Sequence, residues 1–155
     1  MSRPLVPHRG FELLSVGERF PLPARTLTEA HFAAFQLLTG DNHPIHYDRE
    51  YCKAQGHRDL LAHGLHLLAL TAAGAGLFPH VIGESLIGFL DVQAKFLKAV
   101  YPGDTLYPLL EITALERQRT TGIVRMRATI ENQDGLLVLD GTHAYLLRLT
   151  RDLEV

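Results

Sequence analysis

Hydrophobic positions recur at helical spacing in the first half of the chain. Residues 29–38 carry apolar side chains at this spacing and predict an amphipathic helix. Thr26 or Thr28 can cap the helix, and with Thr26 as the cap, Glu29 would complete a capping box. Gly40 is expected to end it, because glycine readily adopts the left-handed conformation that follows many helices.

Two further helices are predicted before residue 80. Asp48 can cap a short helix that ends near Gln55, and Gly56 stops it. Residues 62–77 are nearly all apolar, which predicts a long buried helix. Gly74 and Gly76 each cost a helix about 1 kcal/mol relative to alanine. Their presence indicates either a close neighbouring backbone or an early end of the helix.

Beyond residue 80 apolar and polar residues alternate, as they do in strands with one buried face. One set of alternating positions in the third long strand is wholly apolar and is expected to face the core: Val124, Met126, Ala128 and Ile130. The predicted long strands span residues 86–97, 105–117, 122–132 and 136–149.

Turn residues separate these strands. Residues 101–104 read Tyr-Pro-Gly-Asp and residues 132–135 read Asn-Gln-Asp-Gly, both suited to tight reversals. Such short links predict that consecutive strands pair antiparallel. Residues 140–141, Asp-Gly, are interpreted as a bulge inside the last strand. A short strand over residues 18–26 would complete a five-stranded sheet.

Four long strands preceded by one solitary buried helix have a simple packing solution, in which the sheet curls around the helix and covers it. This is the hot-dog arrangement, a fold of the α+β class. The length fits one domain over residues 1–155. Residues 1–17 and 151–155 are expected to be peripheral.

Composition narrows the range of partners. The chain is 46% hydrophobic and 21% charged, which is ordinary for a globular protein. Its net charge of -2 offers no basic field, so neither nucleic acid nor an anionic membrane is expected as a partner. The sequence shows no signal peptide or bilayer-spanning run, which predicts a cytoplasmic protein. The single cysteine, Cys52, excludes an intrachain disulfide and is expected to be inert.

Residues 39–48 hold the clearest candidate chemistry. On a continuous helix Asp41 and His46 would point apart, but Pro44 forces a turn that can bring them together. An acid and a base so placed could share one water molecule. The alternative is a loop that caps two helices, with Asp41 as an Asx-turn residue and His46 merely packed. The segment alone supports both interpretations equally.

A metal site is not predicted. The nine histidines include two pairs with three-residue spacing, His43 with His46 and His63 with His66. A structural zinc site requires four ligands, and the chain has one cysteine and no His-Glu-x-x-His sequence. His66 is expected to be a core histidine.

Four segments, in order over nearly the whole chain, resemble the MaoC-like dehydratases, also called R-specific enoyl-CoA hydratases. This resemblance implies a hot-dog fold, a homodimer or a higher oligomer of dimers, and reversible hydration of a trans-2-enoyl-CoA, with no cofactor beyond the coenzyme A of the substrate. The segments that carry it are Thr39-Gly40-Asp41-Asn42-His43-Pro44-Ile45-His46-Tyr47-Asp48, Ala62-His63-Gly64, Phe96-Leu97-Lys98 with Pro102-Gly103-Asp104-Thr105, and Asn132-Gln133-Asp134-Gly135.

The resemblance also implies roles for individual residues. The catalytic pair falls on Asp41 and His46, and we expect His46 to activate the water and Asp41 to protonate the substrate Cα. Gly64, at the start of the buried helix, would offer its backbone N–H to the thioester oxygen. Gly64 and the adjoining His63 are therefore predicted to bind substrate. Taken alone, His63 and Gly64 would be read as an ordinary helix start.

The chain departs from the family pattern at two places. The family commonly has asparagine immediately before the proline, where this chain has His43, and the asparagine is displaced to Asn42. The orientation of the catalytic pair must then be achieved differently. A hydroxyl often found two turns into the helix would fall near Ala72, with Thr71 as its only close substitute.

Two other functions remain open at this point. A hot-dog thioesterase would bind the same acyl-CoA, but it normally uses a carboxylate from the central helix, and residues 62–77 contain none. A non-catalytic acyl-CoA-binding subunit would keep Asp41 and His46 only for structure.

Overall fold

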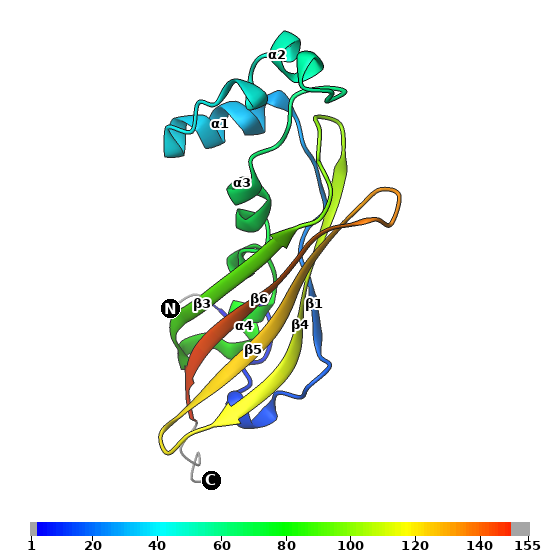
Figure 1. Cartoon of the computed structure of the whole chain (residues 1–155). Coiled ribbons are helices and arrows are strands. Elements are labelled where there is room, and N and C mark those ends of the chain that lie inside the picture. Colours follow the sequence, from blue (N-terminus) through cyan, green and yellow to red (C-terminus); the bar gives the residue numbers. More distant parts are fainter. Residues whose placement is uncertain (1–2, 150–155) are drawn as a thin grey trace.

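The computed structural model describes residues 3–149 and shows an antiparallel sheet with helices along one face and beyond one end (Figure 1). The strand order is β1-β4-β5-β6-β3, and β2 also pairs with β4. The strands are β1 (Arg19–Pro21), β2 (Arg25–Thr26), β3 (Leu86–Phe96), β4 (Thr105–Arg117), β5 (Thr121–Asn132) and β6 (Leu137–Arg148).

The four long strands confirm the alternating pattern. In β5 the predicted inward positions Val124, Met126, Ala128 and Ile130 are all fully buried. The predicted early strand is present as two short pieces, β1 and β2, which both pair with β4. The sheet curls around the helical segment that precedes β3, so the fold is a hot-dog of the α+β class (Figure 1).

Two details of the sheet differ from the prediction. First, β3 does not pair with β4 but crosses to the far edge and pairs with β6. The link between β3 and β4 is tied to other segments instead, because Leu97 N–H donates to the Val138 carbonyl and Gly103 N–H donates to the Leu27 carbonyl, both at 2.8 Å. A chain held in this way cannot form a hairpin.

Second, the bulge in β6 lies at Val138, where the register with β5 shifts between Leu139 and Leu137. The pairing runs without a shift through Asp140 and Gly141, so the bulge predicted there is wrong. Gly141 has a different role, since a Cβ at this position would collide with the backbone carbonyl of Gln93 on β3. The missing side chain lets the two strands approach closely.

The two helices that flank residues 40–48 are formed as predicted. Helix α1 (Glu29–Thr39) ends at Gly40, whose φ of 74° is left-handed. Its capping box joins Thr28 to His31 rather than Thr26 to Glu29. Helix α2 (Arg49–Ala54) begins where the Asp48 side chain accepts a hydrogen bond from the Tyr51 N–H at 3.0 Å.

The predicted long buried helix is broken into pieces. Helix α3 (Gly64–Ala69) ends early, the 3-10 turn η3 (Ala73–Ala75) follows, and helix α4 (Phe78–Ile82) completes the segment. The Thr71 hydroxyl donates to the Leu68 carbonyl at 2.7 Å, at the end of α3. A Cβ on Gly76 would lie 2.6 Å from Leu22 Cδ2, so this glycine admits the neighbouring chain. The helix therefore ends early, and a neighbouring chain segment also comes close to one of its glycines, so both predicted reasons for Gly74 and Gly76 apply.

The remaining 3-10 turns are η1 (Phe11–Leu13), η2 (Pro44–His46) and η4 (Gly83–Ser85). Phe11 and Leu14 are buried in the core, so residues 1–17 are not wholly peripheral. The expected peripheral tail at 151–155 lies outside the described residues. Within residues 3–149, no helix combines the length and hydropathy needed to cross a bilayer.

The core has two parts. One lies around α4 and contains Phe78, Ile82 and Met126. The other lies between α1, α3 and the sheet and contains Phe32, Leu67 and the fully buried Cys52. Each fully buried large apolar side chain contributes about 1.5–3 kcal/mol to stability. The second part of the core supports the candidate site.

Candidate active site

The proline-bent segment between α1 and α2 brings its acid and its histidine together. Pro44 begins the turn η2, which carries His46 back toward Asp41. One carboxylate oxygen of Asp41, one ring nitrogen of His46 and one ring nitrogen of His63 all lie within 4.8 Å of one another. One water molecule can bridge groups at this separation, because each of its hydrogen bonds spans about 2.7–2.8 Å.

The hydrogen bonds of His46 fix its tautomer. Its Nδ1 lies 2.6 Å from the Leu61 carbonyl oxygen, and a carbonyl can only accept, so Nδ1 carries the proton. The neutral ring therefore keeps its lone pair on Nε2. A residual exposure of 9% shows that the ring is held in the structure rather than free in solvent. His46 is thus prepared to accept a proton at a defined atom.

Asp41 is exposed, and its backbone is anchored more firmly than its carboxylate. The backbone N–H donates to Thr39 Oγ1 at 3.2 Å, and the backbone carbonyl lies 3.2 Å from the Tyr47 hydroxyl. Within the described part of the chain, the carboxylate accepts one backbone contact, from the His43 N–H at 3.5 Å, which is long for a hydrogen bond. An Asx turn is present, as the alternative interpretation requires, but it leaves most of the carboxylate available.

The departure from the family motif has a structural explanation. His43 Nδ1 accepts a hydrogen bond from the Ile45 N–H at 3.2 Å and so caps the turn η2. An asparagine oxygen can make the same type of contact. Asn42 turns away and accepts from Gln36 of α1 at 2.6 Å. His43 therefore stabilises the turn that carries His46.

His63 lies beside His46 and is almost completely buried. The two rings stack, with centroids 3.7 Å apart and an interplanar angle of 22°. His63 Nε2 lies 2.8 Å from the Tyr47 hydroxyl and 3.3 Å from the Asp41 carbonyl oxygen. Burial lowers the pKa of His63, and the nearby His46 lowers it further, while the backbone contact to Asp41 opposes the shift.

Tyr47 was missed by the sequence analysis, although it directly follows His46 in the motif. Its hydroxyl lies within hydrogen-bonding distance of His63 and of the Phe32 and Asp41 carbonyls. Burial raises the pKa of Tyr47, and the Asp41 charge raises it further. The Leu61 carbonyl was also missed, because a backbone acceptor leaves no signal in side-chain pattern.

The cluster of Asp41, His46 and His63 contains three groups of the kind that bind metals. The ring geometry argues against a shared ion. A metal bound to histidine lies near the ring plane, along the nitrogen lone pair. The His46 and His63 planes are nearly parallel, so their lone pairs do not converge on one point.

Gly64 begins α3 and borders a cavity of about 320 Å³. A Cβ on Gly64 would lie 3.2 Å from Cζ of Phe96, so the glycine lets this ring pack against the helix start. Leu61 also lines the cavity, whereas neither Asp41 nor His46 does. The cavity therefore reaches Leu61, whose carbonyl holds His46. Among the described residues that line the cavity, Lys98 is the one that carries a charge.

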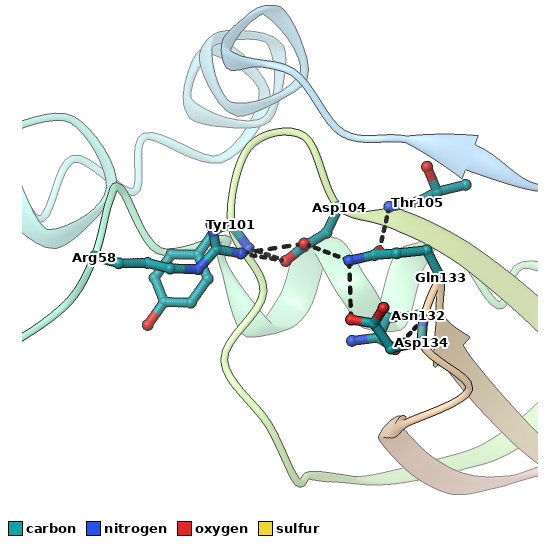
Figure 2. Close-up of polar contacts among 7 residues, drawn as sticks. All are labelled: Arg58, Tyr101, Asp104, Thr105, Asn132, Gln133 and Asp134. Atoms are coloured by element: carbon teal, nitrogen blue, oxygen red, sulfur yellow. Dashed lines mark hydrogen bonds and ion pairs between the residues drawn. The ribbon is translucent and has the colours of Figure 1, made fainter.

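A polar cluster fixes the segment that carries Leu61. Figure 2 shows the Asp104 carboxylate between Arg58 and Gln133. Arg58 lies 3.2 Å from Asp104 Oδ1 and stacks over the Tyr101 ring at 4.2 Å, and Gln133 Nε2 donates to the same oxygen at 3.0 Å. The Asp104 carboxylate also accepts from the Tyr101 N–H at 2.9 Å. The turns at 101–104 and 132–135 thereby hold Arg58, which lies three residues before Leu61.

Comparison with known proteins gives a consistent result. The 3-hydroxyacyl-[acyl-carrier-protein] dehydratase FERN of Solanum lycopersicum is 28% identical over 126 residues, covering 80% of this chain and 72% of that protein. The (R)-specific enoyl-CoA hydratase of Aeromonas caviae is 29% identical over 132 residues, covering 83% and 91%. The solved monoamine oxidase regulatory protein of Archaeoglobus fulgidus superposes with a TM-score of 0.85 at 28% identity, covering 94% and 98%.

A protein-family match covers most of the chain. Residues 14–134 match the family described as the MaoC like domain. That range contains Asp41, His46, His63 and Gly64, together with all three helices nearest to them. The chain belongs to the MaoC-like family of hydratases and dehydratases.

Proposed function

We propose that the protein catalyses the reversible addition of water to a trans-2-enoyl-CoA, giving an R-3-hydroxyacyl-CoA. The observation that carries this proposal is the separation of at most 4.8 Å between the Asp41 carboxylate and a His46 ring nitrogen. The Leu61 carbonyl supports it, because it leaves His46 Nε2 free to accept a proton. Membership of the MaoC-like family supports a hydro-lyase over other activities.

The two residues would divide the proton transfers. His46 Nε2 removes a proton from water while the water oxygen bonds to C3 of the substrate. The electron pair of the double bond moves through C2 to the thioester oxygen, which becomes an enolate. Asp41, carrying a proton, then delivers it to C2 as the carbonyl re-forms. Transfer of the first proton from His46 to Asp41 through solvent restores the starting state.

The enolate oxygen requires a hydrogen-bond donor. Among the described residues, the Gly64 N–H at the start of α3 makes no hydrogen bond. Removing one such donor costs about 2.7–4 kcal/mol in enzymes where it has been measured. Helix α3 spans only six residues, so we assign the effect to the N–H itself rather than to a helix dipole.

A homodimer fits the exposed edge strand of the sheet. Strand β3 carries large apolar side chains that are half exposed on the single chain, including Leu86, Phe89, Leu90 and Phe96. Pairing of β3 with a second copy would cover these side chains and continue the sheet. The reaction itself consists of proton transfers, for which we propose no cofactor beyond the coenzyme A of the substrate.

The test is a direct assay with crotonyl-CoA, following the enoyl absorbance and the release of free thiol in parallel. Loss of absorbance without thiol release is the expected result, and chiral separation of the product should give the R-3-hydroxy acid. Thiol release would instead identify a thioesterase and contradict the proposal.

The relatives include both coenzyme A and acyl-carrier-protein enzymes, so the carrier is tested separately. The same enoyl chains, from short to long, are presented on coenzyme A and on acyl carrier protein. We expect turnover on coenzyme A. Turnover only on acyl carrier protein would contradict coenzyme A as the carrier. The absence of turnover on both carriers would contradict the hydratase function and favour a binding subunit.

A further inference from the structure

We propose that His63 is a positioning residue that holds the imidazole of His46 in its reactive orientation and does not touch the substrate. The effect on turnover rests on the hydratase function proposed above, whereas the effect on His46 itself can be measured without any substrate. The proposal changes the role of His63 that the sequence suggested, which was substrate binding.

Burial is the first reason for this change. His63 is 1% exposed, so its ring offers almost no surface to a ligand in solution. Gly64 lines the neighbouring cavity, but His63 does not. Phe32 and Phe35 cover the ring from α1, with centroids 6.2 and 4.7 Å away. A side chain enclosed in this way acts through its neighbours.

Hydrogen-bond accounting fixes the proton on His63. Tyr47 has one hydroxyl proton, and two carbonyl oxygens, those of Phe32 and Asp41, each lie 3.2 Å from it. If that proton goes to a carbonyl, His63 Nε2–H must donate to the Tyr47 oxygen at 2.8 Å. The opposite arrangement would leave a buried N–H at His63 Nδ1, which has no partner among the described residues. Nε2–H is therefore the favoured tautomer.

The stacked contact with His46 gives the ring its function. The His63 centroid lies 3.7 Å from that of His46, while His43 and Tyr47 stand 6.4 and 6.0 Å away and meet the ring edge to face. Among the aromatic rings of the described residues, His63 is thus the nearest to His46, and together with the Leu61 carbonyl it can prevent His46 from rotating. Loss of this support would tilt Nε2 away from the water it must activate.

Neutrality of His63 makes the contact compatible with catalysis. When His46 takes a proton from water, a charged neighbour would repel it, whereas the face of an uncharged ring attracts a cation. Burial favours the neutral form of His63 and lowers its pKa, in agreement with this requirement. The same ring is tethered through Tyr47 to the Asp41 backbone, so one residue orients both partners.

The experiment compares two variants of His63. His63→Phe keeps a flat ring against His46, and His63→Gln keeps a side-chain N–H near the Tyr47 oxygen but removes the ring. The matched control is His66→Gln, because His66 is another buried histidine on α3 and makes no ring contact with His46 among the described residues. Urea unfolding confirms that each variant is folded under the assay conditions.

The first readout is the tautomer of His46, from the nitrogen chemical shifts of its imidazole in the substrate-free protein. We expect the Nδ1–H form in the parent protein, in His63→Phe and in His66→Gln, and a mixture of both forms in His63→Gln. Equal tautomer states in His63→Gln and His63→Phe would overturn the proposal.

The second readout is the split between kcat and KM. We expect His63→Gln to lower kcat about 100-fold, the size reported for a small misplacement of a catalytic group, with KM nearly unchanged. His63→Phe should recover much of that loss. A fall in kcat that is equal in both His63 variants and in His66→Gln would show a merely structural role. An inactive parent protein with the expected tautomers would contradict the hydratase function but leave the positioning of His46 standing.

Discussion

Two clusters in this molecule pair a buried histidine with a tyrosine hydroxyl at 2.8 Å. One joins His63 to Tyr47 beside the candidate site, and the other joins His143 to Tyr145 on β6. In the second cluster His143 Nε2 also lies 2.9 Å from Thr71 Oγ1. The two clusters resemble each other locally but differ in how much hydrogen-bonding capacity they leave unused.

The cluster around His143 has every proton assigned. Thr71 donates to the Leu68 carbonyl, so its oxygen must accept from His143 Nε2–H, and Tyr145 must donate to His143 Nδ1. Among the described residues, both ring nitrogens of His143 and the hydroxyl proton of Thr71 are thus occupied within the cluster. Beside His63, in contrast, His46 Nε2 has no hydrogen-bond partner among residues 3–149, and the Asp41 carboxylate remains exposed. Unused capacity next to solvent, rather than the presence of histidine, distinguishes a reactive cluster from a structural one.

The largest expected effect comes from removing the two groups that can still act on a ligand, the Asp41 carboxylate and the His46 imidazole. Asp41→Asn and His46→Ala should each lower kcat by about 10²–10⁴-fold, the range typical of general acid–base residues. The fold should remain intact, because Asp41 is exposed and the Cβ of alanine preserves the turn at Pro44. Steady-state kinetics with crotonyl-CoA and circular dichroism measure both effects.

His57→Ala is the matched control for these variants, since His57 contacts Tyr101 and stands outside the cluster. It should retain nearly full activity. Turnover at the parent rate by Asp41→Asn or His46→Ala would remove that residue from catalysis and erase the functional difference between the clusters.

The next effect concerns stability in acid and belongs to the structural cluster. Burial lowers the pKa of His143 to about 4 from 6.5. The unfolded chain therefore binds a proton at His143 below about pH 6.5, whereas the folded chain binds it only below about pH 4. Stability from this group is complete above pH 6.5 and is lost as the pH falls toward 4, by about 3 kcal/mol in all.

His143→Gln tests the acid effect, because glutamine does not titrate. Urea unfolding from pH 7 to pH 4 should show a shallower fall in the free energy of unfolding than in the parent protein. His66, whose pKa burial and nearby positive groups also lower to about 4, should account for a similar share of the fall. Parallel curves for the parent protein and His143→Gln would show that His143 already binds its proton in the folded state.

The sheet was predictable from sequence because its signal is local. Alternation placed the long strands within one or two residues, and glycine-containing turns marked their ends. The partner of β3 was not predictable, because the contacts of the 97–104 link involve Leu27 and Val138, which are distant in sequence. The same limitation explains the bulge at Val138.

The structure of the helical region could be predicted from the sequence only in part. An apolar run from 62 to 77 cannot reveal that Thr71 will bond to Leu68 and to His143, or that Leu22 will approach Gly76. In the site, Asp41 and His46 were predictable because the motif and Pro44 lie within one short segment. Tyr47 and the Leu61 carbonyl became visible only when the fold brought them to the histidines.

A smaller effect is expected where α3 meets the structural cluster. Thr71→Val removes the acceptor of the His143 Nε2–H and leaves a buried donor unpaired. The free energy of unfolding should fall by about 2 kcal/mol, within the range for an unsatisfied buried polar group. Turnover of the folded protein should not change. Thr71→Ser, which keeps the hydroxyl, is the control, and a loss of kcat in Thr71→Val alone would connect this cluster to catalysis.

The smallest effect is expected from Tyr145→Phe, which can be compared directly with Tyr47→Phe. Each substitution removes one hydroxyl that lies 2.8 Å from a histidine nitrogen. Tyr145→Phe should reduce the free energy of unfolding by about 1 kcal/mol and leave kcat unchanged, because His143 loses one neutral hydrogen bond and touches no reactive group. Tyr47→Phe should reduce kcat, because it removes the shorter of the two contacts of His63 Nε2 and leaves the 3.3 Å contact with the Asp41 carbonyl. Kinetics and urea unfolding on both variants complete the comparison, and a loss of kcat in Tyr145→Phe equal to that in Tyr47→Phe would show that the two clusters do not differ in function.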